Sequence, residues 1–372
     1  MHRREILIAI INEVLSDQLE SRALNLHEVF RNEYFLFSVW PFYDFKGNSK
    51  AKRNRLTEFG IHELSGAYGN ILLDSGGFQL YRKDLDLNYL ETLQIYKDAQ
   101  LMKNDHAIAL DFVTFPDDSP KVRLEKIKKN TQIFQKMIIK NKKIVPVIHG
   151  WSEKELTLAS KQLDYGNEFL AFGSGFPMIT IQKGKNLPIK DMIMKRFIDF
   201  LKVIKKQKLD EHRIHVLGAS GQNSSHLCWY AGIDQTDSSS WRIKAAYGKI
   251  ALIGVSEAKV SNVKSSFGVK AWKPKHDQLL KDCECPVCKH LSLPQKKEIL
   301  GQGKSIGFNN RCIHNAYVYL QERELAREMV GTPKYRTYLE KRFKRTWWLK
   351  FLNKIDEGSH QKSLDHYLKS KY

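Results

Sequence analysis

Residues 72–80 read LLDSGGFQL, and this stretch says most about the fold of the chain. The apolar run stops at Asp74, and two glycines follow at Gly76 and Gly77. A short apolar run that ends in a polar residue is typical of a buried parallel strand. Paired glycines let a backbone approach a flat ligand closely. We therefore expect a strand at residues 70–73 with a ligand-binding turn after it.

The same pattern recurs along the chain, with helix-length stretches between the runs. The further runs are Ala107–Leu110 before Asp111, Ile144–Ile148 before His149, Phe169–Phe172 before Gly173 and Ser174, Ile214–Leu217 before Gly218, and a weaker one near Tyr230–Ile233 leading to Asp237. Such βαβ units predict an α/β fold, a (β/α)8 TIM barrel, in which polar residues at strand ends meet at one face. A doubly wound sheet also fits the alternation, but its ligand sites cluster at a single switch point.

The chain is strongly basic. Its 372 residues hold 61 Lys and Arg against 41 Asp and Glu, a net charge of +20, and the 42% hydrophobic content excludes a disordered polycation. Positive charge is concentrated at 121–143 and at 332–355, and aromatic residues are interleaved in the second stretch. A solvated helix face and a docked terminal helix are the simpler interpretations of the two stretches. The overall charge nevertheless favours a polyanionic partner, with nucleic acid the first candidate.

Membrane and secretion signals are missing from the sequence. The best apolar run, Ile6–Ile11, is too short to span a bilayer or to form a signal peptide. The five cysteines are an odd number, which does not suit a disulfide framework. We expect a cytoplasmic protein with no membrane partner, in which cysteines serve a metal.

A metal motif lies in the C-terminal third of the chain. Its four candidate ligands are Cys283, Cys285, Cys288 and His314. Three thiolates and one imidazole complete a tetrahedron, which is typical of structural zinc. We expect Zn²⁺ to hold a loop against a helix that begins at the histidine. Cys228 is expected to be an ordinary buried cysteine, and Cys312 a neighbour of the site, although Cys312 could replace one ligand.

Together these motifs resemble the tRNA-guanine transglycosylase (queuine/archaeosine tRNA-ribosyltransferase) superfamily, whose members exchange a guanine in a polynucleotide for a 7-deazaguanine. The resemblance spans residues 70–330. It rests on DSGGFQ at 74–79, Leu110-Asp111, His149-Gly150, Gly173-Ser174, Leu217-Gly218, Gly232-Ile-Asp234 and the zinc set.

The resemblance implies roles for individual residues. Asp237 would be the nucleophile that attacks the anomeric carbon, and Asp74 the general acid and base, as one carboxylate attacks and the other moves the proton in retaining glycosidases. Asp111 would read the guanine edge, and Phe78 would stack on the ring. The remaining polar rim of the pocket would be formed by Ser75, His149, Gly173 and Ser174. The tRNA enzymes carry Gln in place of the histidine.

Differences from the bacterial tRNA enzymes point to another substrate. Ser-Ser-Ser-Trp-Arg follows Asp237 in place of Cys-Val-x-Pro-Thr-Arg, and a Glu near Gly173 is missing. The length leaves no room for the RNA-binding domains of the archaeal branch, so the chain looks closest to the DNA 7-deazaguanine transglycosylase (DpdA-like) branch. The missing acid favours a neutral 7-substituent, as in 7-cyano-7-deazaguanine. The expected nucleic-acid contacts are Trp241, Arg242, Lys341, Arg342, Lys344 and Arg345.

Alternative functions remain open from the sequence. They are a tRNA-acting enzyme with the same chemistry, and a non-catalytic nucleic-acid-binding subunit, which the presence of both catalytic aspartates disfavours. An unrelated zinc-containing hydrolase is disfavoured because the metal set is closed. We expect a catalytic barrel at 1–272, a zinc-binding subdomain with its following helix at 273–330, and a basic, aromatic-rich helical segment at 331–372. A homodimer or helper proteins are further possibilities.

Overall fold

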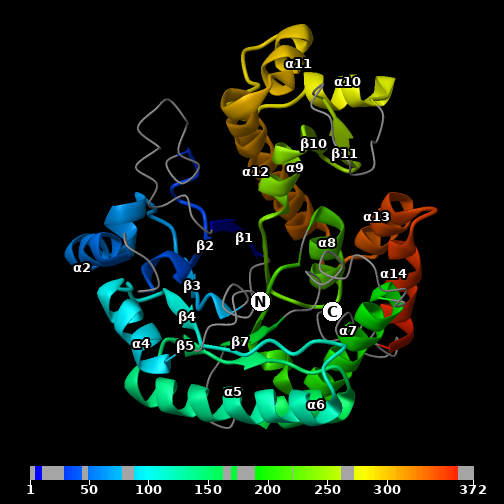
Figure 1. Cartoon of the computed structure of the whole chain (residues 1–372). Helices are drawn as coiled ribbons and strands as arrows, with labels where there is room; N and C mark the ends of the chain where they lie inside the picture. The colour runs from blue at the N-terminus through cyan, green and yellow to red at the C-terminus, as the bar shows by residue number, and fades with distance from the viewer. Residues whose placement is uncertain are drawn as a thin grey trace.

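The computed structural model describes residues 5–10, 29–43, 49–77, 88–161, 169–173, 189–219, 221–260 and 272–358 (Figure 1). Its centre is a parallel sheet with the order β5-β4-β3-β2-β1-β9-β8-β7-β6. The strands are β1 Glu5–Ile10, β2 Phe35–Ser38, β3 Ile71–Asp74, β4 His106–Ile108, β5 Ile144–Val145, β6 Val147–Ile148, β7 Phe169–Phe172, β8 Arg213–Val216 and β9 Gln235–Ser238.

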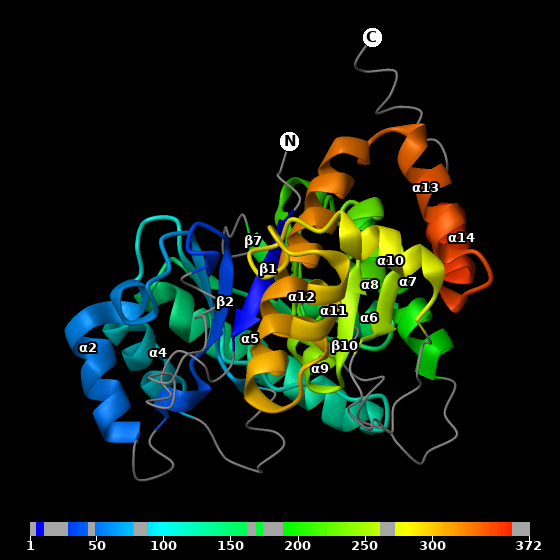
Figure 2. The ribbon, with the colours of Figure 1, turned by 90° about the horizontal axis from the view of Figure 1, so that it is seen from above.

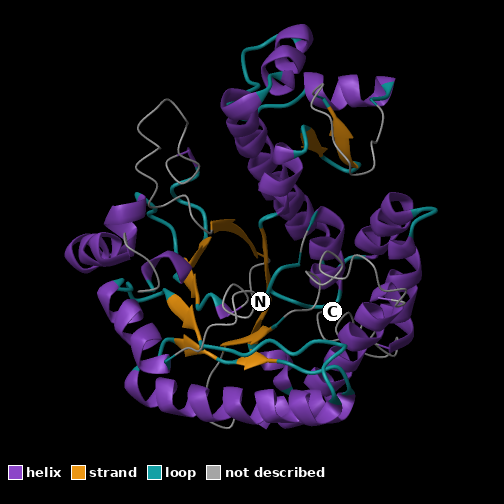
Figure 3. Ribbon diagram, viewed as in Figure 1, coloured by secondary structure: helices purple, strands orange, loops and turns teal. Residues whose placement is uncertain are grey.

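Helices alternate with these strands and lie outside the curved sheet (Figure 3). They are α2 Ser49–Ser65, α4 Tyr89–Asp98, α5 Pro120–Lys140, α6 Glu153–Ser160, α7 Ile189–Lys206, α8 Gln222–Tyr230 and α9 Ser240–Ala246, with short 3-10 turns at Trp40–Phe42 and Leu209–Glu211. Every described strand pair of the large sheet is parallel. The predicted α/β alternation is confirmed.

Helix α5 shows how local sequence forms one of these elements. Ser119 caps its first turn by accepting from the Val122 amide, and Pro120 occupies the first helical position. Ile127, Phe134 and the other apolar residues of one face are buried. The opposite face exposes lysines, so the basic amphipathic helix predicted at 121–143 is confirmed.

The two ends of the strand order are neighbours in the chain. Strands β5 and β6 are separated only by Pro146, which has no N–H to donate and divides the run predicted at 144–148. β5 pairs with β4, whereas β6 pairs with β7. The Pro146 carbonyl accepts from the Ala171 amide at 2.9 Å.

The strand around Asp237 differs from its prediction. Residues 230–233 are not a strand, because α8 ends at Tyr230 and Gly232 adopts a φ of +93° in the following turn. The strand is β9, whose buried side chains Gln235 and Thr236 are polar and hid it from an apolar-run search. Strands β1 and β2 were not predicted either.

The last part of the chain forms a second unit beside the sheet. It contains the antiparallel hairpin of β10 Lys249–Leu252 and β11 Ser256–Lys259, and the helices α10 Pro274–Lys281, α11 Leu293–Gly301 and α12 Lys304–Met329. Figure 2 shows α12 beside β10, with α10 and α11 on the same side. The expected helix start at His314 is wrong, since α12 begins ten residues earlier, at Lys304.

The C-terminal basic stretch is helical, as predicted, but it forms two helices. These are α13 Pro333–Phe343 and α14 Trp347–Gly358, and α14 packs against α7 (Figure 1). Tyr335, Phe343 and Phe351 are buried against the rest of the molecule. Within the described ranges, no helix is long and apolar enough to cross a membrane.

Candidate active site and metal centre

Three carboxylates gather at the carboxyl ends of the strands. Asp74 ends β3, Asp111 follows β4, and Asp237 lies in β9. Asp74 keeps some exposure, but desolvation of its carboxyl group, together with the negative charges of Asp111 and Asp237, raises its pKa to about 7. Hydrogen bonds from the Gly76 amide, at 3.2 Å, and from Ser38 oppose this rise. A carboxyl with such a pKa can both give and take a proton near neutral pH.

Asp111 forms hydrogen bonds with two side chains that were predicted to line the same pocket. Ser75 Oγ donates to its Oδ1 at 3.1 Å, and His149 Nε2 lies 2.7 Å from its Oδ2. A carboxylate only accepts, so the ring N–H of His149 donates. A Cβ at Gly77 would lie 2.6 Å from the Asp111 carbonyl oxygen, so only glycine fits there. Tyr43 further fixes the turn by donating to the Ser75 carbonyl at 3.0 Å.

The described hydrogen bonds to the Asp237 side chain all reach the same carboxylate oxygen. Its Oδ1 accepts from His215 Nε2 at 3.0 Å and from the Gly218 amide at 2.7 Å. Among the described residues no hydrogen bond reaches Oδ2. Sequence reasoning missed His215, although a histidine inside the apolar run 214–217 was a visible signal. The two oxygens of this carboxylate therefore have different surroundings.

The backbone at the end of β7 is also fixed by a residue that the sequence did not reveal. Arg196 of α7 is 1% exposed and donates to the carbonyls of Gly150 and of Gly173, the latter at 2.7 Å. Its guanidinium lies 4.5 Å from the centre of the Trp151 ring, and burial lowers its pKa to about 9. A Cβ at Gly173 would lie 2.3 Å from the His149 ring, so only glycine fits at the end of this strand.

The residues predicted to line the pocket fall into two groups. Phe78 and Ser174 lie outside the residues that the structure describes. The other predicted pocket residues lie at the carboxyl ends of their strands, where Ser75, Asp111 and His149 are in direct contact. The signal that found them was the position of a polar residue directly after an apolar run.

Two of the expected nucleic-acid contacts are corrected by their burial. Trp241 is 3% exposed and packs in the core, so it does not offer a face to a base. The Arg342 side chain is 1% exposed and forms an ion pair with Glu322 at 2.9 Å. Burial alone would raise the pKa of Glu322, but Arg342 and His226 outweigh it and lower that pKa to about 2. Arg342 therefore joins α13 to α12 and does not bind a phosphate.

The remaining expected contacts lie at or near the surface. Lys341, Lys344 and Arg345 are exposed where α13 ends and the chain turns toward α14. Arg242 is half-buried, with its guanidinium 5.8 Å from the centre of the Phe308 ring. These positions are compatible with nucleic-acid binding.

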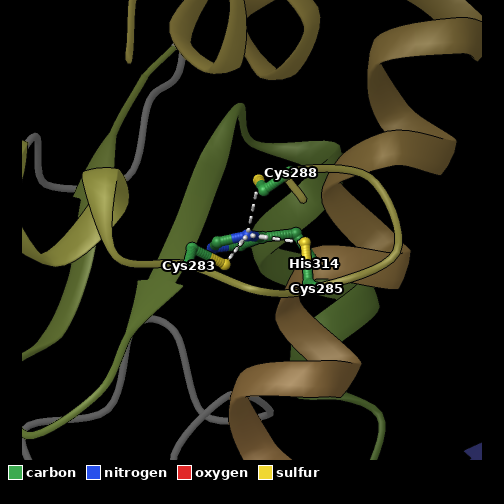
Figure 4. Close-up of side chains that lie close together, drawn as sticks. All are labelled: Cys283, Cys285, Cys288 and His314. Carbon is green, nitrogen blue, oxygen red and sulfur yellow. Dashed lines mark hydrogen bonds between the residues drawn. The ribbon is translucent and has the colours of Figure 1, made fainter. Parts of the chain in front are cut away.

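The four predicted metal ligands converge in the second unit. Their ligand atoms lie within 4.8 Å of one another, all four residues are buried, and the three sulfurs surround His314 Nδ1 at 3.5, 3.5 and 3.6 Å (Figure 4). His314 Nε2 lies 3.0 Å from the Ala251 carbonyl and must donate to it, so the lone pair of Nδ1 faces the sulfurs. The group could hold a metal ion.

The other two cysteines lie outside this ligand group. Cys228 is fully buried, as predicted, and burial raises the pKa of its thiol. Cys312 is buried near the group, on the same helix as His314, but it is not among the four residues whose ligand atoms converge. The ligand set of three cysteines and one histidine is therefore the one that the geometry supports.

Comparison with known proteins agrees with this geometry. No curated protein matches the chain. A family model described as TGT, queuine tRNA-ribosyltransferase, matches residues 11–347 and so covers both the strand-end carboxylates and the metal group. The chain therefore belongs to this family of guanine transglycosylases, pentosyltransferases that act on nucleic acid.

Proposed function

We propose that this transglycosylase removes a guanine from DNA and inserts a 7-deazaguanine, with 7-cyano-7-deazaguanine as the incoming base. One observation carries the chemistry. Asp237 presents a carboxylate oxygen without a hydrogen-bond partner among the described residues, and burial together with the charges of Asp111 and Asp237 raises the pKa of Asp74 to about 7. A nucleophile and a proton-transfer group thus share one site.

The proposed reaction runs in two halves. In the first, Asp237 Oδ2 forms a bond to the anomeric carbon, the bond from that carbon to the guanine nitrogen breaks, and protonated Asp74 gives its proton to the departing base. In the second, ionised Asp74 takes the ring N–H proton of the incoming base, whose nitrogen displaces Asp237 from the sugar. A pKa near 7 keeps both forms of Asp74 populated at neutral pH.

Base selection would fall to the group around Asp111. We assign its carboxylate to the N1–H and exocyclic amine of the purine, because only a guanine-like edge offers two adjacent donors there. Ser75 and His149 already bind that carboxylate and so fix its orientation. Gly173 and Ser174 would complete the rim, and Phe78 would stack on the ring.

The choice of DNA depends on sequence differences from the tRNA enzymes. The Ser-Ser-Ser-Trp-Arg stretch after Asp237 replaces the motif of the bacterial tRNA enzymes. The exposed lysines of α5 and the exposed cations after α13 would hold a phosphate backbone while one base leaves the stack. Their charge serves DNA and tRNA equally, and the absence of an acid near Gly173 supports a neutral nitrile on the incoming base.

The metal is proposed to be structural zinc. Tetrahedral zinc with bonds of about 2.3 Å to sulfur and about 2.0 Å to nitrogen requires sulfur-to-nitrogen distances of about 3.5 Å. The distances from Cys283, Cys285 and Cys288 to His314 Nδ1 are 3.5, 3.5 and 3.6 Å. With four protein ligands the site has no open position, so the metal would hold the fold and take no part in the exchange.

The architecture is proposed to be a closed eight-stranded barrel, in which β5 and β6 are two halves of one strand. The continuity of the chain through Pro146 and the pairing of these halves with β4 and β7 support this closure. For the domains we keep the proposed boundary at residue 330, but we move the one expected at residue 272 to the start of β10 at Lys249. The hydrogen bonds of Ala251 to His314 and Asn315 favour placing the β10–β11 hairpin with the metal-binding unit.

Substrate competition tests this function directly. The protein is incubated with labelled guanine and either guanine-containing duplex DNA or bulk tRNA, and incorporation of label into each polynucleotide is measured. Exchange on DNA is the expected result, and addition of unlabelled 7-cyano-7-deazaguanine should suppress it. Exchange confined to tRNA would replace DNA by tRNA as the substrate, and a preference for the aminomethyl base would overturn the nitrile assignment.

A non-catalytic, nucleic-acid-binding subunit is the remaining alternative. Such a subunit has no need of a buried nucleophile or of a second carboxyl held near neutrality, yet Asp237 and Asp74 are both present and mutually positioned. Binding of DNA without any exchange of label in either polynucleotide is the outcome that would favour it.

A further inference from the structure

We propose that His215 is a positioning residue for the nucleophile. By donating to one oxygen of Asp237, it turns the other oxygen toward the anomeric carbon. This inference rests on the proposed function, since it assigns a role to His215 within that reaction.

The geometry around Asp237 is asymmetric. His215 and the Gly218 amide both donate to Oδ1, at 3.0 and 2.7 Å. Gly218 has a φ of +64°, a left-handed conformation that aims its amide at the carboxylate. Within the described ranges no donor reaches Oδ2. Two donors from β8 and its following turn therefore fix the rotation of the carboxylate.

The position of the His215 side chain is fixed by burial and by its place in the sheet. It is fully buried in β8, and the register places it opposite Ala171 on one side and Gln235 on the other. Its Nδ1 has no hydrogen-bond partner among the described residues. Because Nε2 must donate to the carboxylate, the hydrogen bond that this ring makes among the described residues goes to Asp237.

The same contact can serve both halves of the reaction. When Oδ2 bonds to the sugar, Oδ1 becomes the carbonyl oxygen of the ester and can keep both hydrogen bonds. When the second half breaks the ester, the pair of electrons returns to the carboxylate and the two donors stabilise the charge that reappears. Loss of the His215 donor should therefore lower the rate of both steps, while binding of the base at Asp111 stays unaffected.

Two variants of similar side-chain length separate positioning from packing. His215→Gln keeps a donor at about the place of Nε2, whereas His215→Met fills the space without a donor. His106→Met is the matched control, because His106 is a histidine of another strand of the sheet, β4, where its ring packs against Phe169, and none of the described hydrogen bonds of the three carboxylates involves it. Folding of each variant is checked by thermal unfolding. Exchange is measured on DNA and on tRNA, together with the fraction of protein bound covalently to the polynucleotide in denaturing gels.

The expected result is a selective loss. His215→Met should lower kcat by roughly 100-fold, the cost of misplacing a reacting group, with KM for the base within about twofold, and should reduce the covalent complex. His215→Gln should recover most of kcat, and His106→Met should retain it.

Other results have clear meanings. Wild-type kcat in a folded His215→Met variant overturns the proposal, as does equal loss in the Gln and Met variants. If the Met variant does not fold, near-normal kcat in His215→Gln supports the proposal and a loss as large as that of Asp237→Asn overturns it. A wild-type protein that exchanges on neither polynucleotide overturns the proposed function and, with it, this role. Exchange on tRNA alone changes the substrate and leaves the His215 comparison valid on tRNA.

Discussion

Two buried polar clusters of the described residues, the metal group and the strand-end carboxylates, are held together in opposite ways. In the metal group, each ligand atom faces the same centre, and the outer nitrogen of His314 is satisfied by the Ala251 carbonyl. At the strand-end carboxylates, burial of the Asp74 carboxyl group and the nearby charges of Asp111 and Asp237 together raise the pKa of Asp74 to about 7. We expect a metal ion in the first cluster to stabilise the fold, whereas the like charges of the second cluster oppose folding. The difference indicates that stability and chemistry are assigned to separate units.

Metal removal should have the largest effect. Cys285→Ser replaces a ligand in the fully buried group and should lose the metal and lower Tm by more than about 10 °C, because structural zinc contributes on the order of 10 kcal/mol to such small units. Metal content by elemental analysis and thermal unfolding measure this. Cys312→Ser is the control, since Cys312 is buried nearby but outside the ligand group, and it should keep the metal. Equal metal loss in both variants would contradict the ligand assignment.

Removal of the nucleophile should abolish chemistry without harming the fold. Asp237→Asn should lower guanine exchange by about 1,000-fold or more, whereas Tm stays equal or rises because one like charge near Asp74 is gone. Exchange of labelled guanine and thermal unfolding are the two measurements.

The matched control for this variant is Asp234, which directly precedes the same strand. Asp234 is also a buried carboxylate, and it accepts from the Ile214 amide at 2.9 Å, but it precedes β9. Asp234→Asn should reduce stability and leave kcat within a few fold. Retained exchange in Asp237→Asn would show that another residue attacks the sugar.

The destabilisation of the fold by ionised Asp74 should depend on pH. Its folded pKa of about 7 lies above the ordinary value of 3.8 for an aspartate, so the stability linked to it is fully present below about pH 4 and is lost as pH rises through 7. Asp74→Asn cannot ionise and should therefore become more stable than the wild type at pH 8, by up to the order of 4 kcal/mol. Thermal unfolding at pH 5 and pH 8 measures the difference. A difference that does not grow with pH would contradict the raised pKa.

The smallest effect concerns the surface cations after α13. Replacing Lys341, Lys344 and Arg345 with Ala should weaken nucleic-acid binding by roughly 10-fold at low salt and flatten its salt dependence, with kcat unchanged. Replacing Lys205, Lys206 and Lys208 is the control, since these exposed residues lie before β8, at the opposite end of the sheet from the carboxylates. Equal weakening by both triple variants would indicate only general electrostatics.

Sequence reasoning recovered the elements with continuous apolar runs and the residues that end them. It predicted the strand before Asp74, the helix at α5 and the metal ligands, since each has a local signature. It missed β9 because Gln235 and Thr236 are polar although buried. It placed Trp241 and Arg342 on the surface because composition does not reveal which partner, such as Glu322, covers a charged or aromatic side chain. In each of these cases the structure depends on contacts between residues far apart in the sequence.

The first strand has a consequence for biosynthesis. Strand β1 pairs on one side with β2 and on the other with β9, where Leu7 lies opposite Asp237. The strand of Asp237 therefore joins a partner that is made before the other described strands, and this edge of β1 stays unpaired until nearly the whole sheet has left the ribosome. Long-range pairing of this kind is slow, and an open edge invites aggregation. A nascent chain arrested before β9 would present this edge to chaperones and would still lack Asp237, the carboxylate that we propose as the nucleophile.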